Sequence, residues 1–165
     1  MRDEKDNSND KRESDKGLRV LAGLLTESGL ETRIVKDIIR ETWEKIFVNV
    51  GINAFGALTR LKNGELLSKK GIKRLMGVAV REAIEVAKLK NLNLSEINFV
   101  KLTYDVARKT SDNVNSMLQD VLKKKRTEID FINGKIVEEA KKLGINTPIN
   151  DLLTQLIKGL EISNI

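Results

Sequence analysis

The chain has 165 residues with one proline, no cysteine and no histidine, and 30 basic against 24 acidic side chains give it a net charge of +6 at pH 7. This composition excludes disulfides, thiolate metal sites and histidine catalysis, so we expect no metal site, and any proton chemistry must use Lys, Glu, Asp or Tyr. No apolar run approaches the roughly 20 residues of a membrane span, and the charged N-terminus lacks the apolar core of a signal peptide, so the cytoplasm is the expected location.

The composition predicts an all-α protein. Hydrophobic residues make up 40% of the chain and aromatic residues 4%, and helix formers such as Leu, Ala, Lys and Glu dominate. A chain of this length can bury one core but is short for two ordinary domains. We therefore expect a helical bundle of six to seven helices.

The first residues are expected to differ from the rest. Residues 1–16, MRDEKDNSNDKRESDK, mix both charge signs and have almost no apolar side chain, which predicts a disordered arm or an expression-derived extension. Apolar residues at helical spacing follow from Leu18 and predict a helix that ends at Gly29. A short extended piece, LETRIV, comes next.

Apolar periodicity and capping residues predict the remaining helices. Asn63-Gly64 provides a turn, Asn93 with Glu96 resembles a capping pair, and Thr147 precedes a proline suited to the first helical position. The predicted helices cover 35–61, 72–90, 94–109, a segment within 111–125, the segment between Thr127 and Gly144, and a last helix from Pro148.

A row of polar residues interrupts the apolar surface of the predicted helix 35–61. Lys45, Asn49 and Asn53 recur every four residues and so share one face over about 12 Å. Such a row could donate several hydrogen bonds to one small anionic or carbonyl ligand. The alternative is a partly exposed face, with the lysine reaching water and the asparagines capping nearby loops.

Two further polar groups have both a functional and a structural interpretation. Asn113, Asn115 and Ser116 stand where a helix is expected to begin, and free N–H groups there suit a carboxylate. Ordinary helix capping is the more common explanation for Asn and Ser at such a position. Glu128 could likewise be a first-turn acid that complements the helix dipole.

The basic run KKKR at 123–126 favours nucleic-acid binding only weakly. It is the one dense basic run in the sequence, and no aromatic residues accompany it. A solvated helix end is the more common explanation, so we expect no nucleic acid as a partner.

The order of these motifs resembles a known family. Trp43-x-Lys45 with Asn49 and Asn53 is followed by NGEL, then NVNSMLQDV, then RTEIDFINGKIVEEAKKLGINTPIN. Over about residues 18–161 this pattern resembles the C-terminal domain of ketopantoate reductases (2-dehydropantoate 2-reductases). The resemblance implies a helical fold like the C-terminal domain of 6-phosphogluconate dehydrogenase.

The resemblance also implies a reaction and roles for individual residues. Family members reduce 2-dehydropantoate to pantoate with NADPH, a step toward pantothenate and coenzyme A. By resemblance Lys45 is the proton donor, and Glu128 is a catalytic residue at the junction with the cofactor. The implied substrate-binding residues are Lys45, Asn49, Asn53, Asn63, Asn113 and Ser116. These roles require the Lys45 amine to share a cavity with Ser116 and Glu128.

One feature of the family pattern is absent from this sequence. Family members begin with a Rossmann domain, but no strand followed by G-x-G-x-x-G occurs here, and residues 17–36 resemble only the end of such a domain. We therefore expect 37–165 to be the substrate-binding and catalytic half, inactive alone, with NADP bound mainly by a missing Rossmann domain. We also expect a homodimer through the long helices. A helical dimerisation scaffold without catalysis is the alternative.

Overall fold

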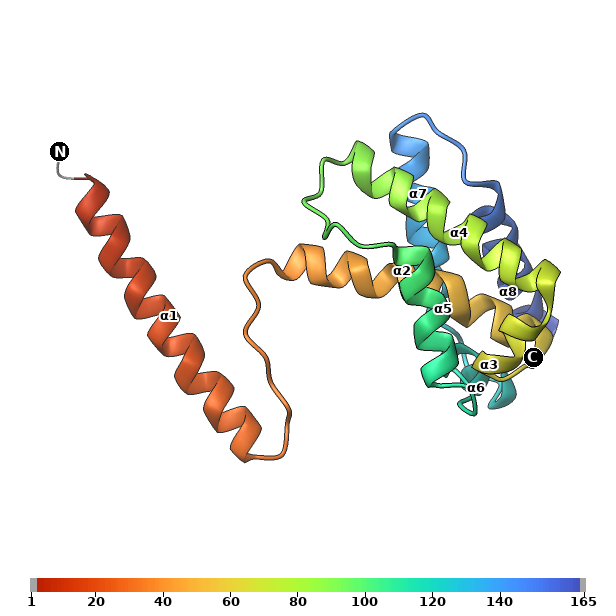
Figure 1. Cartoon of the computed structure of the whole chain (residues 1–165), viewed down its shortest axis with the longest axis horizontal. Coiled ribbons are helices and arrows are strands. Elements are labelled where there is room, and N and C mark those ends of the chain that lie inside the picture. The colour runs from red at the N-terminus through yellow and green to blue at the C-terminus, as the bar shows by residue number, and fades with distance from the viewer. Residues whose placement is uncertain (1–2, 164–165) are drawn as a thin grey trace. The chain divides into compact units, whose positions relative to one another are not determined.

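The structure, a computed structural model, describes residues 3–163, with side chains from residue 15 onward (Figure 1). These residues contain α-helices and one 3-10 turn but no strand, which confirms the predicted all-α class. The elements are α1 (Asp3–Glu27), α2 (Ile38–Thr59), α3 (Asn63–Ser68), α4 (Lys70–Leu89), α5 (Phe99–Lys109), α6 (Ser116–Leu122), η1 (Ile129–Phe131), α7 (Asn133–Lys142) and α8 (Pro148–Ser163).

The chain divides into two compact units, residues 1–38 and 39–165. In the first unit, α1 is one helix from Asp3 to Glu27, whereas the sequence predicts disorder up to residue 16. Glu, Lys and Arg in that stretch favour a helix but the Asp, Asn and Ser between them do not, so the helix there continues the apolar-patterned part that starts at Leu18. The helix ends as predicted, because Gly29 has φ +88° and the N–H of Leu30 donates to the Leu25 carbonyl at 2.9 Å.

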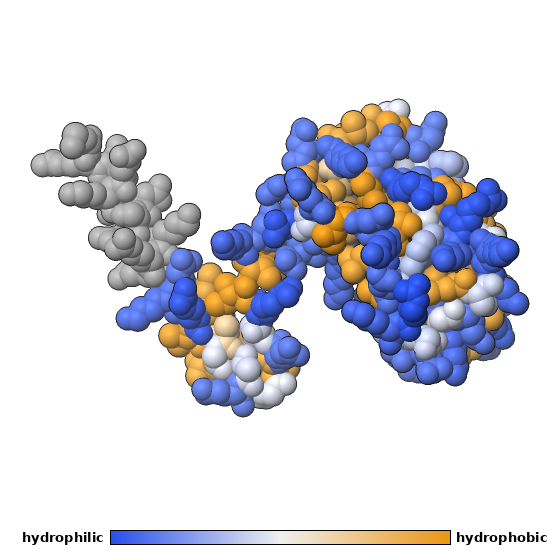
Figure 2. Space-filling view, in the orientation of Figure 1, coloured by the Kyte–Doolittle hydropathy of each residue, from blue (hydrophilic) through white to orange (hydrophobic). Residues whose placement is uncertain are grey.

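The first unit also exposes much apolar surface. Four side chains of α1 are 47–59% exposed, and orange atoms mark apolar residues on the surface of this unit in Figure 2. These exposed residues are Leu18, Val20, Leu21 and Leu24. The segment that follows α1 adds Leu30 and Ile34, which are 61% and 49% exposed. Six exposed large apolar side chains within 17 residues are unusual for a surface with no binding partner.

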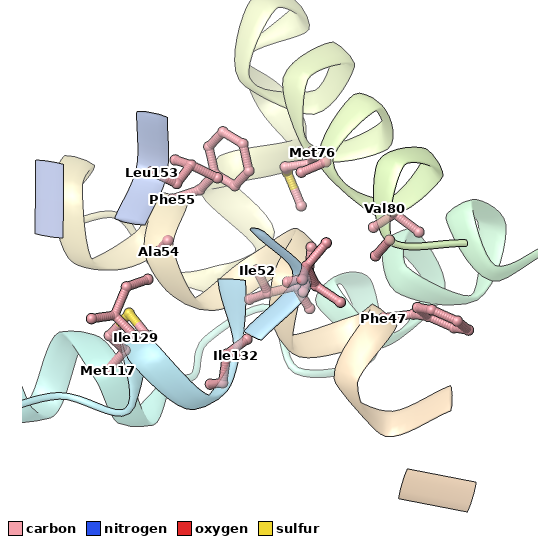
Figure 3. Packing of buried hydrophobic residues seen from close by; sticks show 14 of the residues in the cluster. Phe47, Ile52, Ala54, Phe55, Met76, Val80, Met117, Ile129, Ile132 and Leu153 are labelled. Carbon is pink, nitrogen blue, oxygen red and sulfur yellow. The ribbon is translucent and has the colours of Figure 1, made fainter. Parts of the chain in front are cut away.

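Helix α2 forms the centre of the second unit. All eight residues from Val50 to Ala57 are buried, and the core packs against Phe55, Ile52 and Phe47 from several other helices (Figure 3). The ring of Phe47 lies 4.8 Å from that of Phe99 on α5. The broad apolar coverage seen in the sequence thus reflects a helix surrounded by others.

Two helix starts differ from the prediction. Asn98, not Asn93, caps α5, because its side chain accepts a hydrogen bond from the N–H of Lys101 at 2.9 Å. Asn63-Gly64 begins the short helix α3 instead of only ending α2. The Glu65 carboxylate accepts from the N–H of Lys62 at 2.7 Å and stabilises that start.

Candidate functional site

The polar row of α2 runs from the surface into the interior. Lys45 is exposed, Asn49 is partly buried, and Asn53 is only 6% exposed. None of these three side chains forms a hydrogen bond or ion pair with any residue that the structure describes. A capping role would give the asparagines a partner, so capping does not account for them.

Asn63, by contrast, is engaged in holding a loop. Its backbone N–H donates to the Asn113 carbonyl at 3.1 Å, and its Nδ2 donates to Thr110 Oγ1 at 2.9 Å. The next residue, Gly64, donates from its N–H to the Ser111 carbonyl at 3.1 Å. The Asn63 side chain is 6% exposed, and its Oδ1 is buried without a partner. In this structure Asn63 therefore positions the α5–α6 loop.

The residues at the start of α6 have different surroundings. Asn113 and Ser116 are exposed, and Ser116 is the first residue of the helix. Asn115 is buried and is the N-cap, because its Oδ1 accepts from the N–H of Leu118 at 3.0 Å. Capping thus explains Asn115. It does not explain the exposed side chains of Asn113 and Ser116.

Glu128 lies just before η1, and its side chain is exposed. A 3-10 turn, not the predicted continuous helix, follows it, because the N–H of Phe131 donates to the Glu128 carbonyl at 3.0 Å and the N–H of Ile132 donates to the Ile129 carbonyl at 3.3 Å, each three residues back. The preceding residue is anchored from α8, since the Thr127 N–H donates to Glu161 Oε1 at 2.7 Å. Glu128 is therefore held in place by its backbone and not by its carboxylate.

Ser116 and Glu128 are connected to α2 through neighbouring residues that lie in the hydrophobic core. Their buried sequence neighbours, Met117 and Ile129, belong to the cluster that includes Ala54 of α2 (Figure 3). Lys45, Ser116 and Glu128 are nevertheless all exposed, and no hydrogen bond or ion pair among the described residues joins them. The structure thus shows no contact among these three side chains, and the cavity that the sequence leads us to expect remains a prediction.

Sequence reasoning missed a buried polar network of α4, α7 and α8 that contacts α2, where Asn133 Nδ2 donates to the Val50 carbonyl. The Glu82 carboxylate on α4 accepts from the N–H groups of Ile149 and Asn150, both at 3.0 Å, and from Asn150 Nδ2 at 2.7 Å. Asn133 Nδ2 donates to Asn150 Oδ1 at 3.0 Å. The only signal in the sequence was Glu82 itself, a charged residue beside an apolar face.

Two other classes of site find no support in residues 3–163. Among residues 15–163, whose side chains the structure describes, no cluster of three or more His, Cys, Asp or Glu could hold a metal ion. None of the helices there combines the length and apolar character needed to cross a membrane.

Comparisons with known proteins agree with this fold. Residues 37–161 match the family described as "Ketopantoate reductase PanE/ApbA C terminal". A 2-dehydropantoate 2-reductase from Pyrococcus horikoshii is 40% identical over 134 residues, which are 81% of this chain and 44% of the relative. The chain thus spans about half the length of that relative.

Solved structures of related enzymes have the same helical fold. A PanE/ApbA family ketopantoate reductase from Ralstonia eutropha superposes with a TM-score of 0.83 at 27% identity, over 88% of this chain and 49% of that one. A D-mandelate dehydrogenase solved with NADH and anilino(oxo)acetate superposes equally well, at 0.83 and 28% identity, over 90% of this chain and 62% of its own.

The helical fold around α2, together with these matches, defines a domain of the reductase class. The chain belongs to the ketopantoate reductase family, and residues 37–161 correspond to the family's C-terminal domain.

Proposed function

We propose that residues 39–165 bind a 2-keto acid, 2-dehydropantoate in the first place, and donate the proton in its NADPH-dependent reduction to pantoate, a reaction of pantothenate and coenzyme A biosynthesis. The free polar row on α2 is the observation that carries this proposal. Asn53 is 6% exposed, yet its amide has no partner among the described residues. The Asn53 amide is not one of the fully buried polar atoms that lack a partner, so it still reaches water, and a keto acid could bind there by replacing that water with its own hydrogen bond.

Lys45 is the proposed proton donor. An ammonium next to the keto oxygen polarises the carbonyl and supplies the proton that completes the hydroxyl group. No described acidic side chain pairs with Lys45, so its charge is free to interact with an anionic substrate. Asn49 and Asn53 would orient the keto acid, with Asn113 and Ser116 near its carboxylate and hydroxyl, and Glu128 would stand at the junction with the cofactor.

The described residues do not fit NADP by themselves. They include no strand followed by a glycine-rich turn, the feature that binds a dinucleotide pyrophosphate. NADPH would supply the hydride when bound, so we propose that a Rossmann domain in another part of the protein, or in a partner chain, holds it. The exposed apolar face of α1 is a candidate surface for that domain.

Turnover in the presence of a nucleotide-binding domain tests the role of Lys45. The chain is combined with the Rossmann half of a related reductase, NADPH and ketopantoate, and the oxidation of NADPH is followed. We expect Lys45→Ala to lower kcat by several orders of magnitude, while Lys101→Ala, an exposed lysine on α5, leaves it unchanged. Equal rates for wild type and Lys45→Ala would reject Lys45 as the acid.

Direct binding tests the site without the cofactor. Trp43 is the only tryptophan in the chain, and its ring lies 6.2 Å from that of Phe47 on the helix that carries Lys45. Ketopantoate should therefore change the fluorescence of the isolated chain. A helical dimerisation scaffold, the alternative function, predicts no such change at any ketopantoate concentration.

The choice of keto acid can be tested in the same assay. A D-mandelate dehydrogenase shares this fold, so an aryl keto acid is the competing substrate. The row of amides favours a substrate with several hydrogen-bonding groups over one with a phenyl ring. We expect ketopantoate to bind more tightly than phenylglyoxylate, and the reverse order would assign the domain to aryl keto acids.

A further inference from the structure

Gly56 extends the face of α2 that carries the polar row. It lies seven residues after Asn49, about two helical turns, and so returns to nearly the same side. Gly56 is buried, and a Cβ atom at this position would lie 2.0 Å from Nδ2 and 3.2 Å from Cγ of Asn115. The Asn115 amide therefore fills the space that a side chain at position 56 would need.

The backbone does not require this glycine. Only Gly29 and Gly144 have positive φ angles among the described glycines, so Gly56 has a φ that any residue can adopt. Glycine inside a helix is less favourable than alanine. Its presence in the middle of α2 is thus explained by the side chain packed against it.

Asn115 is longer than its capping role demands. Its Oδ1 caps α6 through the N–H of Leu118, and a serine hydroxyl could do the same. The rest of the amide, Nδ2, is buried against Gly56 and has no hydrogen-bond partner. Asn115, the N-cap of α6, therefore packs directly against α2, the helix that carries Asn49 and Asn53.

A second glycine holds the other end of the same loop. A Cβ atom on Gly64 would lie 2.6 Å from Cβ and 2.9 Å from Cα of Ser111, and the Gly64 N–H donates to the Ser111 carbonyl. Close contacts at Gly64 and Gly56 therefore fix residues 111 and 115. Asn113 lies between these two points, and Ser116 follows directly.

We propose that Gly56 and Asn115 form a size-matched pair that sets the position of Ser116 and Asn113 relative to the polar row of α2. Asn115 is then a positioning residue for the keto acid site. This inference rests on the proposed function, because it assumes that Ser116 and Asn113 contact the substrate.

Four variants of the chain test the pair. Gly56→Ala puts a methyl group where the amide lies and should displace the loop by more than about 1 Å, which weakens ketopantoate binding about tenfold or more. Asn115→Ser keeps a capping hydroxyl but shortens the side chain, so the double variant Gly56→Ala/Asn115→Ser should recover most of the affinity. Gly71→Ala is the control, because no heavy atom lies within 4 Å of a Cβ at that position.

Two readouts separate this proposal from the proposed function. Ketopantoate affinity comes from Trp43 fluorescence, and hydrogen exchange of the Leu118 amide reports the cap with no ligand present. We expect faster Leu118 exchange in Gly56→Ala, restored in the double variant, with affinities that follow the same order. The proposal is wrong if Gly56→Ala has the wild-type Leu118 exchange rate and ketopantoate affinity. It is also wrong if the double variant has the same exchange rate and affinity as Gly56→Ala.

If the wild-type chain binds no ketopantoate, the proposed function fails, and a role of the pair in binding fails with it. Restored Leu118 exchange in the double variant would then identify the pair as a purely structural contact. If the wild type binds ketopantoate but the variants do not differ from it, only the pair is rejected.

Discussion

The buried carboxylate of Glu82 on α4 accepts two hydrogen bonds from Asn150 on α8, one from its backbone N–H at 3.0 Å and one from its side-chain Nδ2 at 2.7 Å. The same Nδ2 also donates to the Ala79 carbonyl at 3.0 Å, and Asn133 of α7 donates to the Asn150 Oδ1. Three helices thus meet at one amide. The negative charge of Glu82 also complements the positive end of the α8 dipole.

Replacing Asn150 by Ala should destabilise the domain strongly. The substitution removes the three hydrogen bonds of the Asn150 side chain, to Glu82, to the Ala79 carbonyl and from Asn133, while Glu82 keeps the two backbone N–H donors. The loss should cost about 1–3 kcal/mol in the free energy of unfolding. Urea unfolding followed by circular dichroism measures the change. Gln155→Ala, an exposed position on the same helix, is the control and should stay within about 0.5 kcal/mol of wild type. A similar small effect of Asn150→Ala would show that the network contributes little.

Asn53 and Asn63 should respond differently to replacement by alanine. Asn53 has no partner to lose, so Asn53→Ala should weaken ketopantoate binding with little change in Tm. Asn63→Ala removes the hydrogen bond to Thr110 and should lower the unfolding free energy by about 1 kcal/mol. Thermal unfolding and Trp43 fluorescence on both variants provide the comparison. If Asn53→Ala lowers Tm but not affinity, the free amide has a structural role.

The stability of the domain should fall in acid because of Glu139. Hydrogen bonds from the ammonium groups of Lys142 and then Lys90 lower the pKa of Glu139 from 4.5 to about 2. A carboxylate with a lowered pKa adds stability that is fully present above the ordinary pKa and is lost as the pH falls through the folded value. This contribution should therefore disappear between about pH 4.5 and pH 2.

Unfolding midpoints measured from pH 2 to pH 7 test this. Glu139→Gln should have a flatter profile than wild type over the acid range, whereas Glu85→Gln, exposed on α4, should keep the wild-type profile. Parallel profiles for wild type and Glu139→Gln would mean that these ion pairs do not contribute to acid sensitivity.

The apolar face of α1 should promote association. Leu21 and Leu24 are 53% and 59% exposed, and covering such a surface is favourable. Sedimentation velocity over a range of concentrations should show dimers or larger species of the isolated chain. Leu24→Lys should shift the chain toward monomer, while Thr26→Lys, which adds the same charge at an exposed polar position, should not. A strictly monomeric wild type at high concentration contradicts the expected homodimer.

The all-helical class and the polar row of α2 could be predicted from the sequence alone. Both depend on spacing along one helix, since apolar residues three and four apart share a face, as do Lys45, Asn49 and Asn53. The stop at Gly29 and the start of α8 at Pro148 are also local, because backbone conformation at one residue decides them.

Only the tertiary structure decided which polar residues are occupied by internal contacts. Asn53 and Asn63 are the same residue type with the same 6% exposure, but Asn63 is bound to Thr110 and Asn113, 47 and 50 positions away. Glu82 with Asn150, and Gly56 with Asn115, likewise depend on partners that are distant in the sequence. The spacing of residues along one helix shows on which face a side chain lies. Its contact partner comes from another helix and therefore depends on how the helices pack together.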